Sequence, residues 1–270
     1  MVKAPGAPPP QHAGVLDPAS ALHLAGILGV APPETRLPPM WHTTHLLDRW
    51  ARADLGPDGH ALRGLPTPPT EPHRRMFAGG RAVHRHPLRL GEPASRTSFV
   101  RSSTVKSGRS GQLTFVTVCH QYEQAGRVAV VDEQDIVYQR ADGGGEATIK
   151  VGPGDVEAVD DETRFEVDPV TLFMFSSATA NAHRIHYDLE YARSEGHPDL
   201  VVHGPLHVLL MAGALSAQGE DFTGREFAYR LLSPARGAQV LRIGTPKAKD
   251  ARVVVVDAAG RRVAQAVLAP

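Results

Sequence analysis

The run from Leu206 to Leu215 constrains the fold most, because it predicts a helix with apolar residues around its whole circumference. Pro205 fits the first turn of this helix, where a backbone N–H group has no intrahelical partner to lose. A helix of this kind has to be buried, so other parts of the chain must surround it. A strongly curved antiparallel sheet can do so, and we therefore predict an α+β fold organised around this helix.

The segment in front of this helix concentrates polar side chains and histidines. It reads FSSATANAHRIHYDLEYARSEGHPDLVVHG over residues 175–204. The residues from Asp188 to Arg193 predict a short helix that ends before Gly196. Gly204 lies where the free N–H groups and the positive end of the long helix point outward, a position suited to stabilising a developing oxyanion.

The N-terminal region contains one clear helix signal. Residues 1–14 are rich in proline and glycine and predict a disordered tail. Asp17 is a good N-cap, Pro18 fits the first helical turn, and Gly29 is a good stop after the apolar run between them. We therefore expect a helix that begins at Pro18 and ends before Gly29.

Prolines interrupt the chain throughout residues 31–72, so that only the stretch from Trp41 to Leu55 could form a helical piece. Long segments of this kind often cover a site as a lid or wall. The alternative is a surface wrap in which Trp41 and Trp50 are packing anchors. The sequence leaves both interpretations open.

Two regions predict antiparallel strands. Residues 77–140 are rich in β-branched and aromatic residues, with turns at 106–111 and 124–126. A glycine-rich and acidic segment at 141–163 is the predicted link to the second region. There, strands are predicted over residues 225–232, 239–244, 252–257 and 262–268. We expect two domains, residues 15–145 and 146–270, each with a helix followed by strands and with their sheets joined.

Composition excludes several classes of protein. The 29 basic and 29 acidic residues balance, without a basic block, so no nucleic acid and no membrane surface is expected as a partner. Cys119 is the only cysteine, so the chain cannot form an internal disulfide or a thiolate metal cluster. The sequence has no apolar run of signal-peptide or membrane-spanning length, which predicts a cytoplasmic protein.

Four short pieces carry a family resemblance: Phe175-Ser176, residues 181–188 (NAHRIHYD), residues 190–192 and Val202-His203-Gly204. In this order and separation they resemble the MaoC-like, double-hotdog dehydratases and hydratases, in particular hydroxyacyl-thioester dehydratase type 2 and mesaconyl-CoA (3-methylfumaryl-CoA) hydratase. The resemblance implies a double hotdog with a degenerate N-terminal and a catalytic C-terminal unit. It also implies an acyl-CoA or acyl-carrier-protein thioester as substrate, no cofactor, and hotdog pairing compatible with a homodimer.

The resemblance also implies a mechanism. In the family an aspartate and a histidine five residues later bind one water, and an N–H group at the start of the central helix polarises the thioester carbonyl. These positions correspond to Asn181, His186 and Gly204. Asn181 departs from the family, because an amide can orient a water but cannot take its proton. Met174 stands where a basic residue is expected.

Other polar residues near the motif allow more than one interpretation. His183, Arg184, Val202, His203 and Trp41 are predicted to contact the substrate, although His183 and Arg184 could equally be hydrogen-bonded loop residues. His203 could shape only the start of the helix. A metal site is a further alternative, with its ligands drawn from His183, His186, Asp188, His203 and His207. The loop position of the first pair and the abundance of histidine argue against this metal site.

The resemblance and these residues together imply a hydratase or dehydratase that adds or removes water at the double bond of an enoyl or hydroxyacyl thioester. His186 has an ordinary pKa close to physiological pH and is the predicted base. A short or branched acyl-CoA such as mesaconyl-CoA is the expected substrate. The alternative is an acyl-binding or scaffold protein that kept the fold without the activity.

Overall fold

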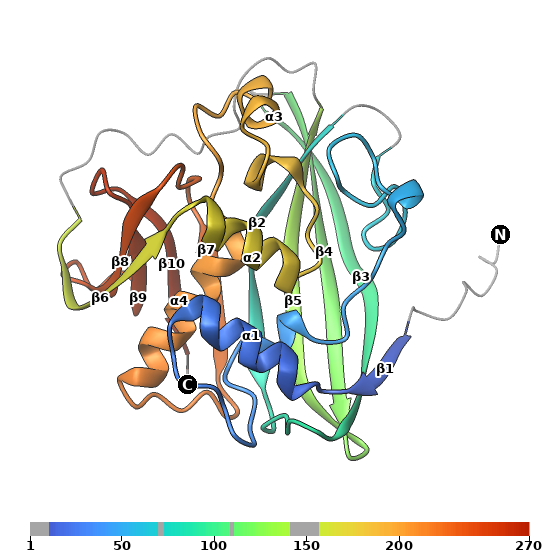
Figure 1. Ribbon diagram of the computed structural model, residues 1–270, viewed down its shortest axis with the longest axis vertical. Helices are drawn as coiled ribbons and strands as arrows, with labels where there is room; N and C mark the ends of the chain where they lie inside the picture. The colour runs from blue at the N-terminus through green and yellow to red at the C-terminus, as the bar shows by residue number, and fades with distance from the viewer. Residues whose placement is uncertain (1–10, 70–72, 109–110, 141–156, 270) are drawn as a thin grey trace.

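A computed structural model describes residues 11–69, 73–108, 111–140 and 157–269. Within these residues one ten-stranded antiparallel sheet has the strand order β1-β3-β4-β5-β2-β7-β10-β9-β8-β6 (Figure 1). The strands are β1 Gln11–Val15, β2 His73–His84, β3 Pro93–Gly108, β4 Gly111–Gln124, β5 Arg127–Arg140, β6 Val159–Val167, β7 Glu226–Leu231, β8 Gln239–Pro246, β9 Val253–Val256 and β10 Arg262–Leu268. The helices are α1 Pro18–Leu28, α2 Pro169–Ala178, α3 Leu189–Ser194 and α4 Gly204–Ala217, with 3-10 turns at Trp41–Thr44, Arg52–Asp54 and Arg184–His186.

The two halves of the chain meet in the middle of this sheet. Strands from residues 11–140 occupy five neighbouring positions, and strands from residues 159–268 occupy the other five. The antiparallel pair β2–β7 joins them, with Arg81 opposite Ala228. The predicted joining of two antiparallel sheets is therefore confirmed. The predicted domain boundary at 145/146 lies outside the described residues and stays a prediction.

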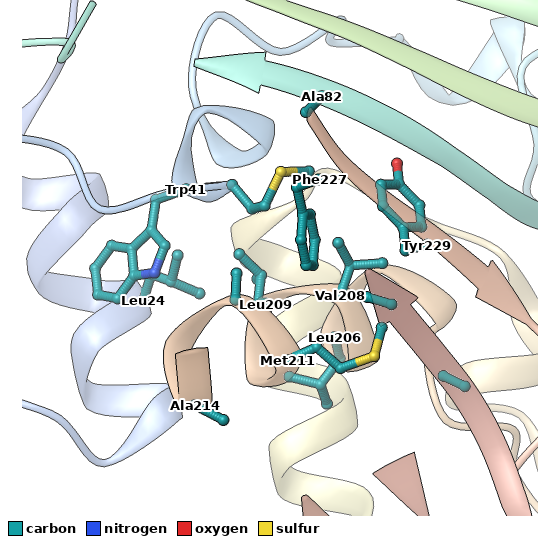
Figure 2. Packing of buried hydrophobic residues seen from close by; sticks show 14 of the residues in the cluster. Leu24, Trp41, Ala82, Leu206, Val208, Leu209, Met211, Ala214, Phe227 and Tyr229 are labelled. Atoms are coloured by element: carbon teal, nitrogen blue, oxygen red, sulfur yellow. The ribbon is translucent and has the colours of Figure 1, made fainter. Parts of the chain in front are cut away.

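Helix α4 is the centre of the hydrophobic core, as its apolar sequence predicts. Leu206, Met211 and Leu215 are completely buried, and α4 contacts β8, β9, β10 and β2. Figure 2 shows its side chains between Trp41 and Leu24 on one side and Phe227 and Tyr229 of β7 on the other. The sheet therefore surrounds the helix and fixes the position of its N-terminus, where the site is found.

Capping fixes the ends of the helices that precede the site. The Asp17 side chain accepts from the N–H of Ala19 at the start of α1, and Gly29 ends this helix in the left-handed conformation, as predicted. Asp168 accepts from the N–H of Thr171 and begins α2. The sequence interpretation has no helix at α2: it assigns no element to residues 169–174 and includes residues 175–178 in the polar segment that follows them.

Three local predictions are wrong. Residues 11–14 are not a disordered tail: they belong to β1, whose backbone pairs with the edge of β3. The stretch 41–55 forms two short 3-10 turns instead of a helix, because Leu46 within it adopts a left-handed conformation that a helix cannot contain. Strand β6 begins within the predicted link 141–163, of which residues 141–156 lie outside the described residues.

Candidate active site

A cavity of about 1820 Å³ lies between the two halves of the molecule. Asn181, His186 and Gly204 all line this cavity, and so do His183 and Val202. Strand β2 supplies the opposite wall, and a loop at residues 56–60 adds to it. The structure thus places the three predicted catalytic positions at one cavity, and both halves of the chain enclose it.

His186 is held in one tautomer. Its Nδ1 lies 2.7 Å from the backbone carbonyl oxygen of Val201, which can only accept a hydrogen bond, so Nδ1 carries the proton. The Nε2 atom of the neutral ring therefore has a free lone pair. Burial lowers the pKa of His186 to about 4, against a smaller effect of the Val201 carbonyl that raises it. The side chain is neutral at physiological pH and is able to accept a proton.

His203 packs against the ring of His186. The two rings are stacked with centroids 3.6 Å apart, and Ser176 Oγ on α2 shares a hydrogen bond of 2.8 Å with His203 Nε2. His203 is completely buried and is not part of the cavity lining. His203 is therefore placed to position His186 and the start of α4, and its predicted contact with substrate stays a prediction.

Gly204 follows His203 directly and is the first residue of α4. The first N–H groups of a helix have no intrahelical acceptor and lie at its positive end. A Cβ atom added at Gly204 would lie 3.0 Å from Cδ1 of Phe77 on β2, so the backbone here faces the cavity wall closely. Gly204 thus lines the cavity directly after His203, whose ring stacks on His186, and its N–H group has no intrahelical partner.

Asn181 and His183 form the turn that leads into His186. Asn181 Oδ1 accepts from the backbone N–H of His183 at 3.0 Å, which leaves the Nδ2 group to donate elsewhere. The rings of His183 and His186 have centroids 5.6 Å apart. Burial lowers the pKa of His183 to about 2, so it is a neutral hydrogen-bonding group at physiological pH.

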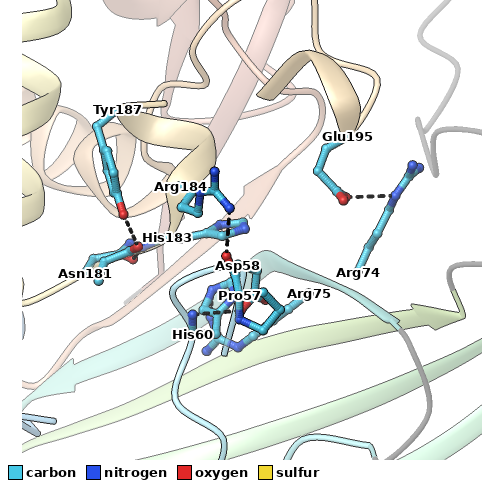
Figure 3. A network of polar contacts seen from close by, with 11 residues as sticks. Pro57, Asp58, His60, Arg74, Arg75, Asn181, His183, Arg184, Tyr187 and Glu195 are labelled. Carbon is cyan, nitrogen blue, oxygen red and sulfur yellow. Dashed lines mark hydrogen bonds and ion pairs between the residues drawn. The ribbon is translucent and has the colours of Figure 1, made fainter. Parts of the chain in front are cut away.

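The sequence interpretation misses the loop from Pro57 to His60, which reaches the site from the first half of the chain (Figure 3). His60 Nδ1 lies 3.0 Å from Oδ2 of Asp58, and the His60 ring is 4.0 Å from that of His183 between centroids. The sequence Pro57-Asp58-Gly59 signals a turn. It contains no signal for contact with residues more than 120 positions away.

Two predicted substrate contacts lie elsewhere. Arg184 binds Asp188 at 2.7 Å and donates to the carbonyl of Pro57 at 3.1 Å, so it ties the loop to the start of α3 and does not line the cavity. Asp188 also caps α3, as predicted. Trp41 is 4% exposed, packs in the hydrophobic core and is not part of the cavity lining, which agrees with the interpretation of this residue as a packing anchor.

A family profile covers the whole of this site. The profile of the hydroxyacyl-thioester dehydratase type 2 family matches residues 40–236, which include the Asn181–His186 segment and Gly204. The chain belongs to this family. As a hydroxyacyl-thioester dehydratase type 2 protein it is a hydratase or dehydratase of acyl-CoA thioesters, which confirms the prediction from the sequence.

Similar proteins and similar solved structures support this membership. The family member is 44% identical over 220 residues to mesaconyl-C(4)-CoA hydratase of Chloroflexus aurantiacus, covering 80% of this chain and 77% of the relative. It resembles the MaoC-like dehydratase of Phytophthora capsici with a TM-score of 0.62 and 14% identity, covering 97% and 96% of the two chains. A Mycobacterium tuberculosis protein described as a double hotdog matches with a TM-score of 0.52 and 14% identity over 97% and 94%. These likenesses confirm the double-hotdog fold.

One group of residues in this family member has the spacing of metal ligands. Ligand atoms of Asp58, His60 and His183 lie within 4.8 Å of one another. However, Asp58 already binds Nδ1 of His60, and the Arg75 guanidinium lies 3.4 Å from His60 Nε2. A cation would meet this positive charge, so the donor set fits a hydrogen-bonded network better than a metal ion.

Met174, where the family resemblance implies a basic residue, lies on α2 and packs partly buried against the core. It is not part of the cavity lining. Among the described residues, no helix is long and apolar enough to cross a membrane.

Proposed function

We propose that His186 is the general base of the reaction, that Asn181 orients the reacting water, and that the Gly204 N–H group stabilises the thioester oxygen. The observation that carries this proposal is the bond from His186 Nδ1 to Val201, which leaves Nε2 as a base at the same cavity as Gly204. The remaining Asn181 Nδ2 group can hold a water beside it.

Hydration proceeds in two proton transfers. Nε2 of His186 takes a proton from the water, its oxygen bonds to the β-carbon, and the electrons of the double bond move onto the thioester oxygen. The resulting enolate accepts a hydrogen bond from Gly204, a contact that typically contributes about 2.7–4 kcal/mol to transition-state stabilisation. The imidazolium then returns the proton to the α-carbon. Dehydration is the reverse.

The low pKa of His186 fits these two proton transfers. In the free enzyme burial disfavours the imidazolium, and its pKa is about 4. When the enolate forms, its negative charge lies close to the protonated ring and stabilises it. The proton is therefore held only while the intermediate exists, and the neutral base is regenerated.

A short enoyl-CoA is the proposed substrate class, with mesaconyl-CoA as one member. The name of the relative at 44% identity supports this choice. The balanced charge, with no basic docking block, favours coenzyme A over a carrier protein. The cytoplasmic location and the homodimer predicted from the sequence stay predictions.

Replacing His186 by alanine tests the mechanism. The variant is expected to lose about 100- to 10,000-fold in kcat, because a positioned base contributes on that order. The measurement is loss of enoyl absorbance with crotonyl-CoA and mesaconyl-CoA. His23→Ala, which removes an exposed histidine on α1, is the matched control. Full activity of a folded His186→Ala protein would remove the proposed base, and tight coenzyme A binding without turnover in the wild type would favour the scaffold alternative.

A further inference from the structure

Arg75 on β2 lines the cavity and is half-buried there. Half-buried arginines elsewhere bind carboxylates: Arg74 binds Glu195 at 3.1 Å, and Arg262 binds Glu157 at 2.8 Å. Among the described residues Arg75 has no carboxylate partner. Its hydrogen bond runs from Nη1 to His60 Nε2 at 3.4 Å. A guanidinium in a cavity without an anion is a site that a ligand can complete.

His60 fixes the orientation of this guanidinium. Its Nδ1 donates to Asp58 Oδ2, so its Nε2 is the acceptor that holds Nη1 of Arg75 (Figure 3). Burial lowers the pKa of His60, so the ring stays neutral beside the arginine. The N–H groups of Arg75 that do not face His60 or Tyr138 are left to bind a ligand, and the planar guanidinium matches the two oxygens of a carboxylate.

Tyr138 supplies a second donor. It lies opposite Arg75 in the β2–β5 register, so the two side chains project from the same face of the sheet. Tyr138 is 3% exposed, lines the cavity, and its hydroxyl oxygen lies beside the Arg75 guanidinium, while its O–H group has no acceptor within the described part of the chain. A buried donor without an acceptor is costly, so an acceptor group of a ligand beside it would be stabilised. Burial raises the pKa of Tyr138 and the Arg75 charge opposes this, so the hydroxyl keeps its proton and can donate.

The distance from the reacting groups defines the ligand. Phe77 on β2 is the residue that faces Gly204 closely, and Arg75 lies two positions before it on the same face, about 7 Å along the strand. This is too close to the thioester for the phosphates of coenzyme A, which lie at the far end of the pantetheine arm. A group bonded to the β-carbon of a short acyl chain can reach Arg75 while the thioester oxygen lies at Gly204.

We propose that Arg75 and Tyr138 form a subsite for a carboxylate on the β-carbon of the substrate. The substrate is then the monothioester of an unsaturated dicarboxylic acid, of the fumaryl type. This rests on the proposed function, because Gly204 and His186 set the position of the acyl group. The carboxylate neutralises Arg75, accepts from Tyr138 and aligns the β-carbon with the water held at Asn181.

Fumaryl-CoA and crotonyl-CoA form the matched substrate pair, because they differ only in a carboxylate or a methyl group on the β-carbon. The wild type is expected to prefer fumaryl-CoA in kcat/KM. In Arg75→Met this preference should fall by about 10- to 100-fold, the usual value of a charge-assisted hydrogen bond, and Arg75→Lys should recover part of it. Arg85→Met, which removes an exposed charge just beyond β2, is the control and should keep the wild-type ratio.

Other outcomes separate the two proposals. A wild type that hydrates crotonyl-CoA but not fumaryl-CoA would overturn the subsite and leave the hydratase mechanism intact. If neither is hydrated, the mechanism fails, and calorimetric titration then decides the subsite. Fumaryl-CoA should bind to the wild type more tightly than crotonyl-CoA does, and Arg75→Met should not show this difference. If Arg75→Met does not fold, Tyr138→Phe should lower the preference by removing one hydroxyl. Unchanged preferences in Arg75→Lys and Tyr138→Phe would also overturn the subsite.

Discussion

Asn181 occupies the position where the family resemblance implies an aspartate. Its Oδ1 accepts from the N–H of His183, and a carboxylate oxygen can accept the same bond. Asn181→Asp is therefore expected to keep the turn and to keep or raise activity. The added negative charge at the cavity should raise the pKa of His186 from about 4.

The pH dependence of kcat/KM checks this expectation. Only neutral His186 is a base, so the wild-type rate should rise with pH through about 4 and stay level above it. In Asn181→Asp the rising limb should move to higher pH. Asn181→Ala, which loses both the turn and the water contact, is the comparison variant. A folded but inactive Asn181→Asp protein would show that the amide itself is required.

Residue types in the motif allow the acid–base group and the oxyanion donor to be predicted, because both lie close together in sequence around α4. The tautomer of His186 is not predictable in this way, since it depends on the Val201 carbonyl, which adjoins it only in the fold. The burial of Trp41 likewise depends on residues distant in sequence, among them Leu24 of α1 and the side chains of α4.

At the scale of elements, the loop at residues 56–60 completes the site, and Gly59 allows it to do so. Gly59 has a φ of +90°, and an added Cβ would lie 1.8 Å from the carbonyl oxygen of Ala182. Gly59→Ala should therefore displace the loop, separating His60 from His183 and breaking the bond from the Arg184 N–H to the Asp58 carbonyl. We expect a loss of about 1–3 kcal/mol in the free energy of unfolding, together with lower kcat/KM.

Urea unfolding and steady-state kinetics of the same preparation measure both effects. Gly26→Ala is the matched control, because this glycine is in α1 and an added Cβ meets nothing within 4 Å. That change should stabilise the protein slightly, since alanine favours helix more than glycine does. Wild-type stability and activity in Gly59→Ala would mean that the close approach of the loop to residue 182 contributes neither to stability nor to activity.

At the scale of the whole molecule, the joined antiparallel sheet follows from an apolar helix that must be surrounded and from two sets of strand signals. The sequence does not predict which loop of the first half meets the histidine segment of the second. That contact depends on the β2–β7 pairing, which brings Arg75, Phe77 and the loop at 56–60 against the start of α4. The substrate side of the cavity is therefore a property of the assembled sheet.

Histidines with lowered pKa values, most of them at the same cavity, make the stability of the molecule depend on pH. Burial lowers the pKa of His84 to about 3, of His120, His186 and His207 to about 4, and of His183 to about 2, all from an ordinary value of 6.5. Between about pH 4 and 6.5 the unfolded chain thus binds more protons than the folded one, so stability is full above 6.5 and is lost as the pH falls. Each such histidine contributes a slope of up to about 1.4 kcal/mol per pH unit in this window.

Urea unfolding at intervals between about pH 7.5 and 5 measures this slope directly. His84→Leu replaces one buried histidine that does not line the active-site cavity, and it should lower the slope by about one proton. Carboxylates with lowered pKa values, such as Asp58, lose their protons well below this window and leave it unaffected. A free energy of unfolding that stays constant from about pH 7.5 to 5 would mean that these rings are solvated. It would also contradict the neutral, buried state of His186 on which its role as base depends.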